Sequence, residues 1–332
     1  MQKNLDCSPV FPPKEGSLRD GYVLSAENAL AMRKSLRFFL EGILSNILAV
    51  RLPSMPRELV LRSEGHFHLV PELFLQVSGS TRFMLPHEEL ELNPGEALIM
   101  PPRVLHAELA LENTPGEMFR NVVVFVNGTA LTCHLAHDGG SSKRPGILHL
   151  EARHHTHAPR IHDWLADAAN LGWEAQKQQT PEMKKLLSAQ MRALVASACA
   201  GVLRVLDDSA PNTKPEPVMI TRVRMWVQNR LGDHDLSVPK LAMQAGCTPD
   251  YLSHIFSHTT GENLVTYINR ERMQRAASLL AETKMVGKEV AWVCGFSTPS
   301  YFIQMFRTHY GTTPKNWRAK RKNDSGNNQP ED

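Results

Sequence analysis

The spacing of hydrophobic positions changes along this chain from a short, strand-like pattern to a helical one. Between residues 56 and 150 the apolar residues come in short runs separated by turn residues such as Ser78-Gly79 and Asn93-Pro94-Gly95. The runs are ELVLRS, ELFLQVSG, RFML, ALIMPP, AELAL, NVVVFV and ILHL. Many short strands with glycine and proline turns predict a small antiparallel β-barrel or jelly roll.

Helical spacing flanks this region on both sides. Residues 26 to 50 are predicted to be helical and the first twenty irregular, so residues 1–55 form an extension and a helix. Within residues 151–208, the segment PEMKKLLSAQMRALVASACAGVLRVLDD predicts a long amphipathic helix. Its apolar positions are Leu186, Leu187, Met191, Leu194, Val195, Ala198 and Val202. This helix either packs on its own domain or dimerises with a second copy, and the spacing allows both.

Residues 209–217, SAPNTKPEP, contain three prolines and no apolar period, so they predict a linker. After it, TPDYLSHIF at residues 248–256 returns as TPSYFIQMF at residues 298–306. Threonine caps a helix and proline suits its first turn, so each copy marks a helix start. Each is preceded by a short apolar helix pattern and a turning glycine, Gly246 or Gly295, which completes a helix-turn-helix unit.

The two predicted units occupy residues 218–322, and residues 323–332 are expected to be a disordered tail. Between the units, NLVTYINRERMQRAASLLAE predicts one helix of about 20 residues, on the order of 30 Å long. That length approaches one turn of B-DNA, roughly 34 Å, which is the spacing of successive major grooves on one face. The fold class is therefore multidomain α+β, with an N-terminal barrel, connecting helices and an all-α tandem helix-turn-helix domain.

Charge is distributed unevenly along the chain. Residues 212–323 carry 16 Lys and Arg against 8 Asp and Glu, whereas residues 1–211 carry 21 against 23. This asymmetry indicates a polyanionic partner for the C-terminal part.

These C-terminal residues closely resemble the AraC/XylS family of transcriptional regulators over residues 218 to 318. The most diagnostic segment is VAWVCGFSTPSYFIQMFRTHYGTTPKNWR. It contains a Gly295-Phe296-Ser297 turn and ends with the motif from Gly311 to Arg318. The resemblance implies a cytoplasmic regulator, more often an activator, that binds double-stranded DNA and RNA polymerase as a homodimer. It also implies that the exposed faces of the two recognition helices contact DNA. The residues concerned are Asp250, Ser253, His254, His258, Pro299, Ser300, Ile303, Gln304, Arg307 and Lys315.

The chemistry of individual side chains refines this prediction. Gln304 suits adenine, Asp250 can accept from cytosine N4, and Ile303 can only pack on a thymine methyl. Phosphate contacts are expected for Arg307, Lys315, Arg318, Lys320, Arg321 and Lys322. For the last three, a solvated face is the favoured interpretation. Family members often have arginine at the positions of His254 and Gln304, so their base preference does not carry over to this chain.

A second constellation lies in the strand-like region, where His66-x-His68-x3-Glu72-x6-Gly79 is followed by Pro94-Gly95 and His106. Residues two apart on a strand share a face. Three imidazoles and a carboxylate inside a barrel suit a divalent transition metal with open positions. The spacing resembles the two motifs of the cupin fold, which commonly forms the sensing half of AraC/XylS regulators.

That resemblance implies that His66, His68, Glu72 and His106 bind a small effector, often a sugar or related metabolite. A metal-free effector pocket is the favoured interpretation. A metal-assisted effector site, a ligand-free scaffold, and a metal-dependent cupin enzyme or metal sensor fused to a DNA-binding module are the alternatives. No cofactor is predicted beyond a possible divalent transition metal. An enzyme is not expected, because catalysis would not need the duplicated basic half.

The remaining features of the sequence indicate no further functional site. No early segment looks like a membrane span, which favours the cytoplasm. The five cysteines are scattered and never in a CxxC pair, so they predict ordinary thiols. The histidines at 149, 154, 155, 157 and 162 fit no common metal motif and are expected in a solvent-exposed connector.

Overall fold

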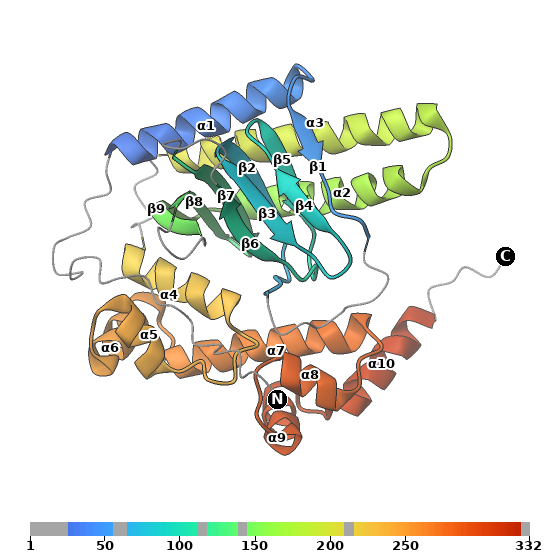
Figure 1. Cartoon of the computed structure of the whole chain (residues 1–332). Helices are drawn as coiled ribbons and strands as arrows, with labels where there is room; N and C mark the ends of the chain where they lie inside the picture. Colours follow the sequence, from blue (N-terminus) through green and yellow to red (C-terminus); the bar gives the residue numbers. More distant parts are fainter. Residues whose placement is uncertain (1–25, 56–64, 112–117, 139–144, 209–215, 327–332) are drawn as a thin grey trace, which may run out of the picture.

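The computed structural model describes residues 26–55, 65–111, 118–138, 145–208 and 216–326. Figure 1 shows a sheet-rich N-terminal part lying against an all-helical C-terminal part. The predicted strand ELVLRS, the first twenty residues and most of the predicted linker lie outside the described residues.

Two separate sheets form the centre of the N-terminal part. The larger has the strand order β1-β5-β2-β7-β8-β9 and the smaller β4-β3-β6. All pairings are antiparallel except the parallel one of β1 with β5. The strands are β1 Ala49–Arg51, β2 Glu72–Ser78, β3 Ser80–Met84, β4 Glu89–Leu92, β5 Glu96–Met100, β6 Ala107–Leu111, β7 Arg120–Asn127, β8 Ala130–Asp138 and β9 Pro145–His154.

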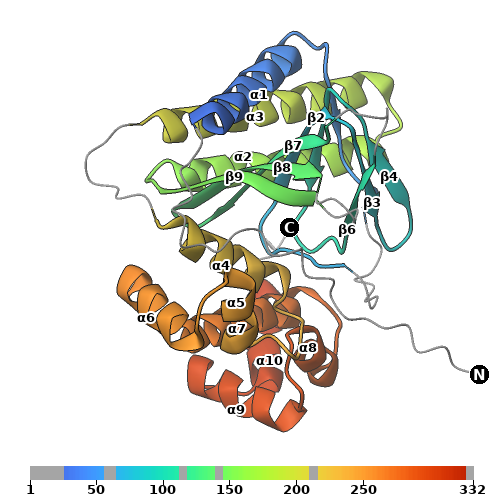
Figure 2. The same cartoon turned by 60° about the vertical axis from the view of Figure 1, so that its left-hand side comes forward.

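Side-chain alternation along the strands produces three layers. On β2, Leu73 and Leu75 point to a core shared with helices, whereas Phe74 points to a core between the two sheets. The helices that cover the outer face of the large sheet are α1 Ala26–Leu44, α2 Ala158–Lys177 and α3 Pro181–Asp207, as Figure 2 shows. Glu72 shares the face of Phe74 and therefore lies on the side between the sheets.

The helix α3 confirms the predicted long amphipathic helix. Leu187, Met191 and Val195 are buried against α1, α2 and the large sheet, whereas Leu186 is exposed. By length and composition α3 could also cross a membrane, but this packing is that of a core helix. Dimerisation through its remaining faces stays a prediction.

Several sequence-based expectations are wrong in detail. The sheets of the described residues do not close into a single barrel but form a two-sheet sandwich, and one pairing is parallel. The jelly-roll alternative, which also consists of two sheets, stays a prediction. Residues 26–50 are not one helix, since α1 ends at Leu44 and β1 follows. The histidine-rich segment is not an exposed connector, because it forms β9 and the start of α2, and His149 is buried.

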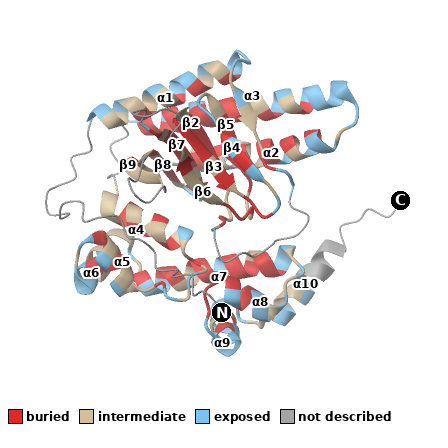
Figure 3. Ribbon diagram, viewed as in Figure 1, coloured by how far each residue is buried: buried red, intermediate tan, exposed pale blue. Residues whose placement is uncertain are grey.

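The C-terminal part is a tandem pair of helix-turn-helix units, as predicted. The first contains α4 Val218–Asn229, α5 Val238–Ala245 and α6 Pro249–Thr260, and the second contains α8 Gly287–Val293 and α9 Pro299–Tyr310. The helix α7 Leu264–Glu282 joins them, and α10 Pro314–Gly326 closes the domain beyond the expected boundary at residue 322. Figure 3 shows the buried stretch along α7 where both units and the N-terminal part meet it.

The turn of the second unit requires glycine. Gly295 has φ +75, and a Cβ there would lie 2.5 Å from the carbonyl oxygen of Leu231. The guanidinium of Arg272 lies on the same side, 2.6 Å from that Cβ position, and donates to the carbonyls of Leu231 and Asp233. Close approach of the two units therefore depends on the absence of a side chain at residue 295.

A buried ion pair holds α1 to the sheet. Arg33 on α1 donates to both oxygens of Glu151 on β9, at 2.6 and 3.0 Å, and also to Asp207 at the end of α3. His149 lies 3.1 Å from the same carboxylate. Burial raises the pKa of Glu151, but hydrogen bonds with His149 and Arg33 outweigh it and lower the pKa to about 2.

We therefore predict that Glu151→Gln lowers the free energy of unfolding at neutral pH by about 3 kcal/mol, the equivalent of this pKa shift. Because the folded pKa is depressed, the contribution of Glu151 is complete above the usual carboxyl value of 4.5 and is lost as pH falls toward 2. Denaturant unfolding between pH 7 and pH 3 measures it. The exposed Glu89→Gln should cost under about 1 kcal/mol, and an equal loss in both variants would contradict the prediction.

Candidate nucleic-acid interface and candidate sensor site

Both recognition helices begin as the repeated Thr-Pro predicts. The Thr248 hydroxyl accepts from the Tyr251 N–H at 3.3 Å, and the Thr298 hydroxyl accepts from the Tyr301 N–H at 3.4 Å. A proline stands in the first turn of each helix. The two copies therefore form capped helices, α6 and α9, with equivalent local geometry.

The amphipathic division of α6 and α9 also matches the sequence. Their inward aromatics Phe256, Phe302 and Phe306 are fully buried. Of the predicted DNA-contacting residues, Ser253 is partly buried, and the exposed ones are Asp250, His254, His258, Pro299, Ser300, Ile303, Gln304, Arg307 and Lys315. These side chains are free to meet another molecule, although their contacts with DNA remain predictions.

Two threonines extend the exposed face of α9. An open groove there is lined by Ser300, Ile303, Gln304, Arg307, Thr308 and Thr313. Thr308 follows Gln304 by one helical turn, so its position could have been inferred from the sequence. Thr313 caps α10 by accepting from the Asn316 N–H, and only the fold brings it to this groove.

One predicted phosphate contact has a structural role instead. Arg318 donates to the carbonyls of Leu280 and Met285, so it ties α10 to the end of α7. Lys315 and Lys320 are exposed, whereas the side chains of Arg321 and Lys322 lie outside the described residues. Arg307, Lys315 and Lys320 are exposed as the phosphate-contact prediction requires, and contacts of these residues and of Arg321 and Lys322 with phosphate stay predictions.

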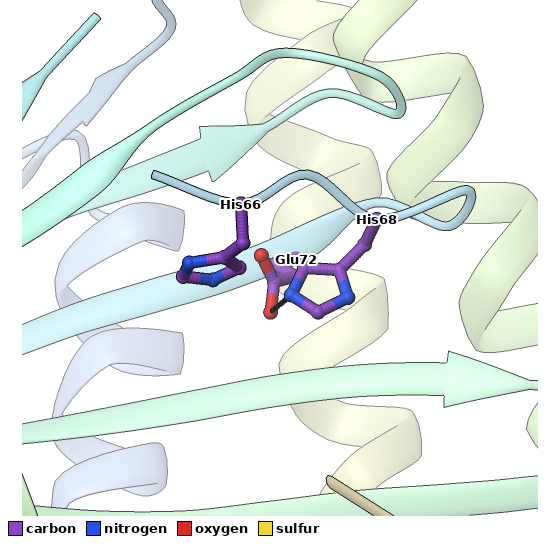
Figure 4. A group of neighbouring side chains, drawn as sticks. All are labelled: His66, His68 and Glu72. Carbon is purple, nitrogen blue, oxygen red and sulfur yellow. Dashed lines mark ion pairs between the residues drawn. The ribbon is translucent and has the colours of Figure 1, made fainter. Parts of the chain in front are cut away.

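The four histidine-motif residues converge at one end of the space between the sheets. His66 pairs with His106 through two backbone hydrogen bonds of 2.9 Å, and the two rings lie 4.5 Å apart. The carboxylate of Glu72, at the start of β2, lies between the rings of His66 and His68, as Figure 4 shows. Its oxygens are 3.5 Å from His68 Nε2 and 3.4 Å from His106 Nε2. The sequence spacing thus predicted a real constellation.

The donor geometry of this cluster fits a metal ion or a polar ligand. One ligand atom each from His66, His68 and Glu72 lie within 4.8 Å of one another, and His66, His106 and Glu108 form a second such group. Bonds of about 2.1 Å in a tetrahedral site place neighbouring donor atoms about 3.4 Å apart. The buried atoms His68 Nε2, His106 Nε2 and Glu72 Oε2 accept or donate no hydrogen bond within the described structure.

Burial and mutual charge set the protonation of the cluster. Burial raises the pKa of Glu72, but the imidazoles of His68 and His106 outweigh it and lower the pKa. Burial lowers the pKa of His106, but Glu72 and Glu108 outweigh it and raise the pKa. His68 has a lowered pKa because of burial. The cluster thus favours an ionised Glu72 beside a protonated His106.

Two members of the cluster were missed in the sequence. Glu108 follows His106 with the same two-residue alternation as His66 and His68, and burial raises its pKa to about 7. His134 on β8 faces the cluster, and burial lowers its pKa to about 4. The alternation could have revealed Glu108, whereas His134 comes close only through the pairing of β7 with β8.

The cluster borders the C-terminal domain through a small cavity. This cavity of about 60 Å³ is lined by His68, Leu69, Val70, Phe125 and Asn127 from the N-terminal part, and by Gln228, Leu231, Glu271 and Gln274 from α4, its following turn and α7. His68 therefore belongs to the cluster and also lines the interface between the two domains.

Comparison with known proteins matches the C-terminal half. A family model described as a helix-turn-helix domain matches residues 241–320. The uncharacterised HTH-type transcriptional regulator YijO of Escherichia coli K12 is 27% identical over 49% of this chain and 54% of its own. The HTH-type transcriptional activator RhaR of the same strain is 27% identical over 41% of this chain and 46% of its own. The chain thus spans about half the length of these relatives.

A solved transcriptional regulator with an AraC-type DNA-binding domain, from Chromobacterium violaceum, is 25% identical. The match covers 34% of this chain and 96% of that one, with a TM-score of 0.30.

The cluster yields a prediction about metal content. Under the metal-free interpretation, elemental analysis of untagged protein should find well under one transition metal per chain. Stoichiometric metal that is lost in His66→Ala/His68→Ala, and retained in the control His149→Ala, would instead establish the metal-assisted site. The control removes an equally buried imidazole that contacts Glu151 rather than the cluster.

Proposed function

We propose that this chain, whose C-terminal domain is an AraC-type helix-turn-helix DNA-binding domain, is a sequence-specific transcriptional regulator controlled by a small effector. The observation that carries the proposal is the pair of capped helices, α6 and α9, with their polar faces exposed. Both helices pack on the single helix α7, so the chain presents two recognition helices at a fixed distance and orientation. One chain then supplies two recognition helices, which a symmetric dimer usually supplies one from each subunit. Its target DNA sequence therefore need not be palindromic.

The effector pocket is the cluster of His66, His68, Glu72 and His106. A small sugar-like or related metabolite with several hydroxyls suits it, because buried imidazoles and carboxylates can pair with such groups. An effector shifts the equilibrium between two domain arrangements only by its differential affinity for them. Activation, contact with RNA polymerase, homodimerisation and a cytoplasmic location complete the proposal. The activator role is that printed for RhaR.

A metal-assisted effector site is the second candidate. The buried atoms His68 Nε2 and Glu72 Oε2, which have no hydrogen-bond partner within the described structure, favour it, because these two residues form with His66 a group of ligands close enough to share one ion. Turnover by a metal-dependent enzyme is not proposed, in keeping with the regulators among the relatives.

Base readout tests the proposal. In a binding selection over randomised duplexes, His254→Ala and Gln304→Ala should relax two separate base clusters centred about 10 base pairs apart. Each loss should be on the order of 1 to 3 kcal/mol if the side chain makes a good base contact. If both variants lost base preference at the same positions of the duplex, the arrangement of two separate recognition helices would be refuted.

Two matched variants separate readout from other effects. Lys315→Ala should weaken binding to all DNA sequences by the same factor, because a phosphate contact carries no base information. Phe306→Ala removes a fully buried aromatic and should cost roughly 3 to 5 kcal/mol of stability instead of changing the preferred sequence.

Salt dependence provides an independent check on the full chain. Specific affinity should fall steeply with ionic strength, as counterion release requires, and Lys315→Ala should reduce the slope of log affinity against log salt by about 1. Equal affinity for the selected and a scrambled duplex at moderate salt would refute sequence-specific binding.

A further inference from the structure

Two short segments of the N-terminal part face the histidine cluster on one side and the C-terminal domain on the other. We call residues 66–69 and 103–106, joined by the His66–His106 bridge, the histidine ribbon. His66 and His68 belong to the cluster, whereas Phe67 between them is 2% exposed and packs in a core of the C-terminal domain. Successive residues of an extended segment point to opposite sides, so one peptide segment serves both.

The second segment of the ribbon repeats this arrangement. His106 belongs to the cluster, and its neighbour Leu105 packs with Phe67 in the same C-terminal core. That core includes Met273, Ala276, Leu279 and Leu280 of α7, Val290 of α8, and Phe302 and Phe306 of α9. The second helix-turn-helix unit thus completes its core with two residues of the sensor.

Two arginines reinforce this contact. Arg275 of α7 is 5% exposed, and its guanidinium carbon lies 3.5 Å from the centre of the Phe67 ring. Arg103 forms an ion pair with Glu282 at the end of α7, while its backbone N–H donates to the His68 carbonyl at 2.7 Å. Arg103 holds this position with a φ of +66, a conformation that few residues other than glycine adopt.

The first unit meets the sensor differently. Its core contains Val223, Leu241, Phe256 and Tyr267 but no residue of the ribbon. Gln228 and Leu231 of this unit line the small cavity beside His68, and α4 lies against β9. The ribbon itself therefore packs directly into the core of the second unit, whereas the first unit contacts other parts of the sensor and faces the ribbon across the cavity.

We propose that the histidine ribbon transmits the state of the cluster to the second helix-turn-helix unit and only weakly to the first. A ligand that shifts the backbone at His66, His68 or His106 also moves Phe67 or Leu105, because neighbouring residues share that backbone. Packed cores respond to such shifts by switching arrangement rather than by deforming continuously. The inference rests on the proposed function, since it names the regulation of the same effector site.

Amide hydrogen exchange of the full chain tests the coupling without knowledge of the effector. In His66→Ala/His68→Ala, exchange over residues 273–293 should speed up about fivefold or more, while residues 220–256 of the first unit change less than about twofold. Phe67→Leu should give the same pattern with the cluster intact, since leucine keeps the site apolar but loses the ring under Arg275. His149→Ala, the matched buried histidine on the α1 side of the sensor, should leave both ranges unchanged.

Changes confined to the sensor, or equal changes in both units, would overturn the proposal. Base selection gives a second readout, in which Phe67→Leu should relax discrimination about fivefold at the bases read by α9 and leave those read by α6 unchanged. A chain that bound no duplex specifically would refute the proposed function, while the exchange pattern would still decide whether the ribbon couples the cluster to the second unit.

Discussion

The packing of two helix-turn-helix units on opposite ends of one helix is the constraint on which the rest of the molecule depends. Leu264, Tyr267 and Ile268 of α7 belong to the core of the first unit, and Met273 and Leu279 belong to that of the second. A helix of 19 residues is about 28 Å long, and its hydrogen-bonded backbone keeps that length fixed. The separation of the two recognition helices is therefore a property of α7.

Arg272 shows how closely the units are joined. This buried side chain of α7 donates to the backbone carbonyls of Leu231 and Asp233, while Gly295 leaves room for it. A buried charge is tolerated only where hydrogen bonds satisfy it. The same backbone contact both stabilises the arginine and fixes the turn after α4 against the second unit.

The histidine cluster of the N-terminal part carries a different energetic cost. A buried polar atom without a hydrogen-bond partner costs about 1 to 3 kcal/mol, and His68, His106 and Glu72 each hold one such atom within the described structure. The ion pairs of Glu72 with the two imidazoles, at 3.5 and 3.4 Å, offset part of that cost. The remaining cost is the physical basis for proposing a ligand there.

The local rules of the chain determined much of this protein before any tertiary contact was known. The repeated Thr-Pro, the turning glycines and the helical spacing between the repeats predicted α6, α7 and α9, because capping and periodicity act within a few residues. The spacing of His66, His68 and Glu72, with His106, predicted which side chains would meet. What it left open was the occupant of the site, since several ligands suit the same donors.

Tertiary structure alone decided the features that depend on residues distant in sequence. Strand pairing across loops left two sheets instead of a closed barrel, and it buried His149 beside Glu151 and brought His134 to Glu72. Arg318 turned from the surface to the carbonyls of Leu280 and Met285, which no local pattern specifies. The partner of Phe67 also lay beyond sequence reasoning, because the alternation of an extended segment determines which side a residue faces but not what covers that side.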